Sequence, residues 1–327
     1  MQHTANQDLG VRSLTSVRAQ RPVLLTNHIG KIQVHPRELS LSRFITVVVR
    51  AGLALVCVIS LSAQNLTRAE DLYRHTKYEQ SLALLDENAT DAQTTFLIGR
   101  DYFMLGDFKK AAEYIQRSVT AQPLNSEYMD WLGRAYGRRA ETTFPVLAPA
   151  LASKARQAFE HAVALDPKNS EALSDLFEYY LEAPGFLGGG YDKALAVADK
   201  ISAVDPPEGY FAKAQLAQKH REFNDAEQHL RQAAALAPHQ VGRLIDLAKF
   251  LAKQGRTRES DAVFVQAQRL DPNAPKLWFA RADALIKQKR NVQEARNLLE
   301  KYVRASITVD DPPKDDALQL LKQVGGA

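Results

Sequence analysis

The chain has 327 residues, of which 45% are hydrophobic and 24% charged, so it can bury a core and is not a disordered protein. Its formal net charge of +4 is concentrated at one end: residues 1–63 hold seven Lys or Arg against two acids, which leaves residues 64–327 at about −1. A folded part so close to neutral argues against a nucleic-acid-binding protein.

The first 63 residues divide into two segments. Residues 1–42 show no clear periodicity, and we expect either a disordered leader or a translation start further in. Residues 43–63 run from basic residues into an apolar stretch at 51–61 and end in small and polar residues, which is typical of a secretory signal peptide. This apolar stretch is short for a bilayer-spanning helix. We therefore expect an exported protein of the periplasm or cell envelope, with an uncleaved inner-membrane anchor as the alternative.

Motifs that would indicate catalysis are missing from the sequence. The only cysteine, Cys57, lies in the apolar stretch, so the folded part has no thiol for a disulfide, a nucleophile or a metal site. No two histidines have the HExxH spacing of zinc ligands, and the glycines at 188–190 lack the Lys-Ser/Thr of a phosphate-binding loop. We expect no metal, no cofactor and no enzymatic activity.

Prolines recur at regular intervals along the rest of the chain. Each ends a stretch rich in Ala and Leu, and four have the similar contexts ALDP, AVDP, ALAP and RLDP. Their spacings of 44, 39, 32 and 34 residues separate Pro123, Pro167, Pro206, Pro238 and Pro272. This spacing indicates a repeated unit of about 34 residues, with two copies lengthened by insertions.

The second unit shows the side-chain pattern of the repeat. Its positions 8, 11, 15, 17, 20, 24, 27 and 32 hold Gly99, Tyr102, Gly106, Phe108, Ala111, Ile115, Ser118 and Pro123. Small residues at 8 and 20 suit two antiparallel helices, whose backbones approach closely only where small side chains lie at the crossing. The pattern resembles that of the tetratricopeptide repeat family.

The resemblance covers about residues 66–305 in seven units, of which the first is incomplete. It implies an all-α fold for residues 64–327, a right-handed superhelical solenoid of helix-turn-helix units. Repeat arrays need a cover for their last unit, and we expect a capping helix at residues 313–324.

The two insertions fall at the turn between the two helices of units three and four. They carry apolar residues where solvated ones are usual, namely Phe144, Val146, Leu147, Phe186 and Leu187. Either the two segments pack on each other and bury these side chains, or they form an apolar ledge that contacts a partner.

The family resemblance also implies a partner-binding groove on the concave side, lined by positions 2, 5, 9 and 12 of each first helix. The candidate groove residues are Phe96, Arg100, Phe103, Asp130, Arg134, Glu178, Phe211, Gln215, Lys249 and Phe279. Such a groove implies a scaffold that binds a protein or peptide; the alternative is a membrane-anchored accessory subunit that positions a catalytic partner. The Lys–Asn clamp with which one subgroup binds chaperone tails is absent, because Arg100 and Arg134 occupy position 9.

Arg100 and Arg134 share position 9 in adjacent units, so both are expected to point into the groove. Arginine can bind a carboxylate through two parallel hydrogen bonds, so we expect these two residues to be the anchors if the partner carries a carboxylate or an acidic stretch. Their removal is expected to weaken binding much more than folding.

Export can be tested by N-terminal sequencing of the mature protein. We expect the first residue to lie near Gln64, because the signal peptide would be removed after Ala63. Recovery of the intact chain from the soluble cytosol would contradict this prediction.

Overall fold

The computed structural model describes residues 63–325. They lie in the second of two compact units of the chain, Val56–Ala327. The expected leader and all but the last residue of the expected signal or anchor segment fall outside them, so those predictions stay untested. Residues 63–325 contain no β-strand, and none of their helices has the length and hydrophobicity needed to cross a membrane.

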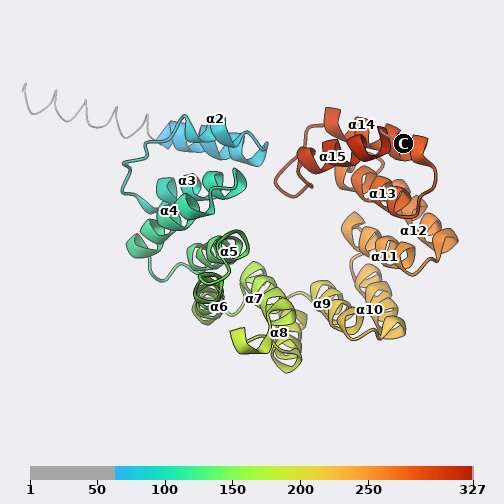
Figure 1. The fold of residues 1–327 in the computed structure, drawn as a ribbon, viewed down its shortest axis with the longest axis horizontal. Helices are drawn as coiled ribbons and strands as arrows, with labels where there is room; N and C mark the ends of the chain where they lie inside the picture. The colour runs from blue at the N-terminus through green and yellow to red at the C-terminus, as the bar shows by residue number, and fades with distance from the viewer. Residues whose placement is uncertain (1–62, 326–327) are drawn as a thin grey trace, which may run out of the picture. The chain divides into compact units, whose positions relative to one another are not determined.

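The helices follow one another in pairs, as the repeat predicts (Figure 1). The first pair is a helix over residues 63–74 and the short α2 (Tyr78–Leu82). The later pairs are α3 (Ala92–Met104) with α4 (Phe108–Ala121), α5 (Ser126–Thr142) with α6 (Ala148–Leu165), α7 (Ser170–Glu182) with α8 (Tyr191–Val204), α9 (Pro206–Lys219) with α10 (Phe223–Leu236), α11 (Val241–Lys253) with α12 (Thr257–Leu270), and α13 (Pro275–Lys287) with α14 (Val292–Arg304). The predicted all-α solenoid is confirmed.

Side-chain caps fix where several first helices begin. Asp91, Asn125 and Asn169 each accept a hydrogen bond from the backbone N–H three residues further on, at 2.8, 3.0 and 3.1 Å. These bonds satisfy N–H groups that have no partner inside the helix. Asp205 caps α9 in the same way and Pro206 is the first residue of that helix, so a single residue joins α8 to α9.

The helices form two layers. Each first helix packs on the second helix of its own unit, and first helices of successive units also contact one another, as α3 does with α5, α5 with α7 and α11 with α13. The first helices therefore make the inner layer and the second helices the outer one (Figure 1).

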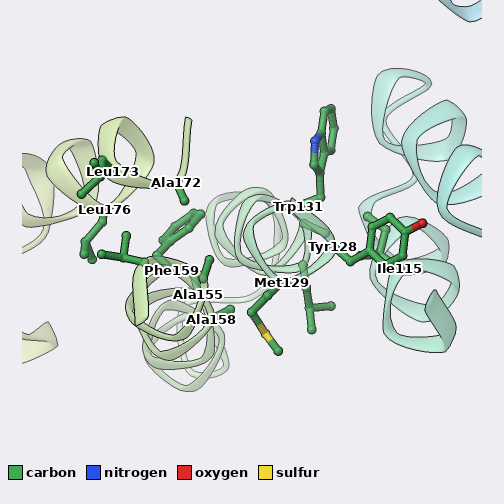
Figure 2. Packing of buried hydrophobic residues seen from close by; sticks show 14 of the residues in the cluster. Ile115, Tyr128, Met129, Trp131, Ala155, Ala158, Phe159, Ala172, Leu173 and Leu176 are labelled. Carbon is green, nitrogen blue, oxygen red and sulfur yellow. The ribbon is translucent and has the colours of Figure 1, made fainter. Parts of the chain in front are cut away.

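The core runs along the seam between the layers. From unit two to the first helix of unit five it joins side chains of α3 to α9 into one cluster. Figure 2 shows that the Phe159 ring of α6 points toward Ala172 of α7, while Met129 and Trp131 point to opposite sides of α5. Each unit thus buries side chains against both its neighbours, as expected of a repeat array.

The insertions have different structures. In unit three the extra residues mostly lengthen α5 and α6, to 17 and 18 residues, and leave a turn at residues 143–147. In unit four the extra residues form a loop with a short 3-10 helix, η1 (Gly185–Leu187). Both lie at the turn within a unit, as predicted.

A helix at the C-terminal end of the array packs on the last pair. It is α15 (Lys314–Gly325), one residue later than expected, and it contacts α14 and α13 through buried Ala317 and Val324. The loop that precedes α15 contacts the other end of the array. Its Val309 packs against the apolar cluster of Ala69, Tyr73 and Leu97 in the first two units.

Gly99→Ala tests the close approach of the two helices in a unit. A Cβ at Gly99 would lie 2.5 Å from Cγ1 of Ile115 and 3.1 Å from its backbone N, so the helices would have to separate. We expect a loss of about 1–3 kcal/mol in the free energy of unfolding, measured by urea titration. Gly137→Ala is the control, since its Cβ would meet nothing closer than Ala155 at 4.0 Å. The control should be neutral or stabilising by up to about 1 kcal/mol, and equal effects of the two changes would contradict the prediction.

Candidate functional site

The expected groove residues differ in how far they reach the concave surface. Glu178 and Lys249 are exposed, whereas Arg100, Phe103, Arg134, Phe211, Gln215 and Phe279 are partly buried. Phe96 and Asp130, which share unit position 5, are buried. Phe96 stacks on Tyr128 and Trp131 of the next first helix, with ring centroids 4.4 and 6.1 Å apart. Position 5 therefore contacts the neighbouring unit more than the groove.

A hollow of the inner layer lies between α9, α11 and α13. It has a volume of about 650 Å³ and brings together Phe211, Gln215 and Lys249, three of the expected groove residues. The rest of its lining is Gln218, Leu230, Asp246, Phe250, Ala252, Lys253, Asp283, Ala284, Lys287 and Gln288. We call this hollow the C-terminal cavity.

Three lysines and two aspartates line the C-terminal cavity. Nζ of Lys287 lies 2.7 Å from the Asp283 carboxylate, whereas Lys249 and Lys253 form no ion pair with any residue between 63 and 325. Burial raises the pKa of Asp246 to about 6, and the nearby Arg243 and Lys249 oppose this shift. The cavity therefore offers two unpaired ammonium groups beside amide and aromatic side chains.

Arg100 and Arg134 both lie against Trp131. Their guanidinium carbons are 4.8 and 4.7 Å from its ring centroid. Arg100 also lies 4.2 Å from the centroid of Tyr73, and its Nε has no hydrogen-bond partner in the described part of the chain. The two arginines are neighbours, as their shared unit position predicts. Arg100, however, makes cation–π contacts with aromatic rings of the protein itself.

Arg134 is surrounded by carboxylates. Its guanidinium lies 3.1 Å from Asp130 and 3.0 Å from Glu171, and it also donates to Asp175. A guanidinium with three acidic partners is not a free anchor for an acidic ligand. Because Asp130 is only 1% exposed and is paired with this guanidinium, we expect Arg134 to matter for folding more than the sequence suggested.

The insertion residues remain largely solvated. Phe144 and Phe186 are 78% and 83% exposed, and Val146 and Leu147 are exposed as well. Leu187 is partly buried, and its carbonyl accepts a hydrogen bond from the Tyr179 hydroxyl at 2.9 Å. The interpretation that the two segments bury each other is wrong for the four exposed side chains. Their contact with a partner stays a prediction.

Several residues of the inner surface were missed in the sequence. Of the acidic residues on α7, only Glu178 was predicted; Glu171, Asp175 and Glu182 lie at intervals of four, three and four with it, which places all four on one face of the helix. That spacing could have been recognised. Lys253, Lys287 and Gln288 lie in the last turn of a first helix or just beyond it, outside the four positions used to define the groove.

No group of three or more His, Cys, Asp or Glu side chains between residues 63 and 325 is arranged to hold a metal ion.

Comparisons with known proteins address the fold. A family model described as tetratricopeptide repeat matches residues 245–309. A tetratricopeptide repeat protein of Parabacteroides merdae has 13% identity and a TM-score of 0.52, and the match covers 81% of this chain and 99% of that one. A thermophilic tetratricopeptide repeat protein of Thermus thermophilus has 23% identity and a TM-score of 0.46, over 60% of this chain and 99% of that one. No curated protein matches the sequence.

Arg134→Ala tests the role of this arginine in folding. The change would leave the carboxylates of Asp130 and Asp175 without their cation, and we expect a loss of about 3–5 kcal/mol in the free energy of unfolding. Arg138→Ala on the same helix is the control, because its ion pair with Glu141 is solvated and contributes about 0–1 kcal/mol. Thermal or urea unfolding measures both variants, and an unchanged midpoint for Arg134→Ala would refute the structural role.

Proposed function

We propose that the chain, whose residues 245–309 match a tetratricopeptide repeat model and whose helices pair as in such repeats, is a non-catalytic scaffold that holds a segment of a partner protein in its inner groove. The C-terminal cavity between α9, α11 and α13 is the observation that carries the proposal. Its volume of about 650 Å³ lies within the usual range of ligand sites, and three successive first helices build it.

The side chains of the C-terminal cavity suit an extended peptide. Gln215, Gln218 and Gln288 offer amide groups that can bond a peptide backbone, which has both donors and acceptors. Phe211 and Phe250 provide apolar surface for a side chain of the partner. Lys249 and Lys253 are available for an acidic residue or a terminal carboxylate.

The proposal also includes the cellular location of the protein. The signal-like segment at 43–63 supports export to the periplasm or cell envelope. If this segment is not cleaved, the solenoid would be held at the inner membrane, where it would position a catalytic partner as an accessory subunit. The apolar residues of the two insertions, Phe144 and Leu147 on one and Phe186 and Leu187 on the other, would add a second contact outside the groove.

Site-specific photo-crosslinking in cells tests the groove. A crosslinking amino acid at Gln215 or Lys249 should capture one partner, whereas the same group at Lys109 or Lys200, exposed on second helices, should not. The double change Lys249→Ala/Lys253→Ala should lower partner affinity at least about tenfold, or about 1.4 kcal/mol, and Lys109→Ala/Lys200→Ala is the matched control. Crosslinks from the outer positions alone would contradict groove binding. A stoichiometric enzyme in the captured complex would favour the accessory-subunit alternative.

A further inference from the structure

We propose that the half of the groove built by α5 and α7 binds a basic side chain, lysine or arginine, of the partner segment. The proposal rests on the proposed function, since it names a chemical feature of the segment that the groove holds. It reverses the expectation that this part of the groove recognises an acidic partner.

A hollow of about 370 Å³ lies between the first turns of α5 and α7. Its lining consists of Glu127, Asp130, Asn169, Ser170 and Glu171. Three of these five side chains are carboxylates and none is a cation. Glu127 and Glu171 are both exposed, so a ligand can reach them from the groove.

Asp130 is the buried member of this lining, and one of its carboxylate oxygens lacks a hydrogen-bond donor among residues 63–325. The Arg134 guanidinium lies 3.1 Å from its Oδ2, whereas its Oδ1 is buried and accepts no hydrogen bond from an N–H or hydroxyl donor in the described part of the chain; its other neighbour is the Asp175 carboxylate. A buried acceptor without a donor costs about 1–3 kcal/mol, and more when it is charged. An ammonium or guanidinium group that enters the hollow would supply the donor.

The surroundings carry an excess of negative charge. Arg134 is shared by Asp130, Glu171 and Asp175, and Lys219 is paired with Glu182 at 2.6 Å. Burial and the nearby Asp175 raise the pKa of Asp130, as expected where carboxylates outnumber cations. Burial, followed by Asp175, Glu182 and Glu141, likewise raises the pKa of Glu178. A basic side chain would relieve this repulsion.

The helix dipole explains the position of only some of the carboxylates on α5 and α7. Glu127 and Glu171 lie in first turns, where negative charge is favourable on any helix. Asp130 and Asp175 lie further along, and Asn125 and Asn169 already cap the two helices. Both aspartates are partners of Arg134, but that single positive charge is shared by three carboxylates. Since the carboxylates are not arranged to hold a metal ion, an organic cation fits the hollow better.

Peptide binding to the full chain tests the proposal. The probe is a fluorescent dodecapeptide of alternating lysine and alanine, followed by anisotropy at low salt, and the comparison probe has glutamate in place of lysine. We expect the lysine peptide to bind more tightly than the glutamate peptide. Glu127→Gln/Glu171→Gln should weaken lysine-peptide binding at least about tenfold, because both side chains line the hollow and neither is buried, so the fold is kept. Unchanged thermal midpoints would verify that the fold is kept.

The matched control is Glu113→Gln/Glu222→Gln, which removes the same charge from exposed positions away from the hollow. Equal weakening by both pairs would show non-specific attraction and overturn the proposal, as would tighter binding of the glutamate peptide. If Gln215 and Lys249 give crosslinks but the chain does not bind the lysine peptide, this inference is overturned and the scaffold function stands. Specific binding of the lysine peptide without any groove crosslink would support the basic-residue site while contradicting the proposed use of the C-terminal cavity.

Discussion

The close approach of two helices within each unit is the contact on which the other features of the solenoid depend. Gly99 of α3 lies against Ile115 of α4, and Gly133 of α5 lies against the Phe159 ring, so that a Cβ at either glycine would be 2.5 or 2.6 Å from the facing side chain. Ala214 and Ala248 occupy the equivalent place in later units and are fully buried. Unit four has the buried Phe177 at this place instead. Because most pairs are closed by a small residue, the first helices can form one inner layer whose exposed faces are left for a ligand.

The sequence predicts the helices and their pairing because one residue pattern recurs in almost every unit. It predicts less of the inner surface, where contacts depend on how far each unit is rotated from the last. Asp130 and Phe96 share a unit position and are both buried, yet only the structure shows that Asp130 lies beside Arg134 and near Asp175 of the next unit. The exposure of Phe144 could not be predicted from the sequence either, since an apolar residue at a turn can pack on a neighbour or remain in solvent.

The groove has two chemically different halves. Around α5 and α7 the carboxylates of Asp130, Glu171 and Asp175 outnumber the single Arg134, whereas Lys249 and Lys253 are unpaired in the C-terminal cavity, within the described part of the chain. A segment with basic residues at one end and acidic residues at the other would therefore prefer one direction along the groove. Electrostatic complementarity of this kind contributes more to specificity and to association rate than to affinity.

The contact of Val309 with the cluster around Tyr73 and Leu97 has a consequence for cooperativity. In a one-dimensional array each unit is stabilised only by its neighbours, so the terminal units unfold first. Here a residue between α14 and α15 supports the first two units, and fraying at either end must break this contact. Amide hydrogen exchange in the two terminal units would then be slowed together. The two ends of the array would then unfold together, whereas in an array without this contact each end would unfold independently.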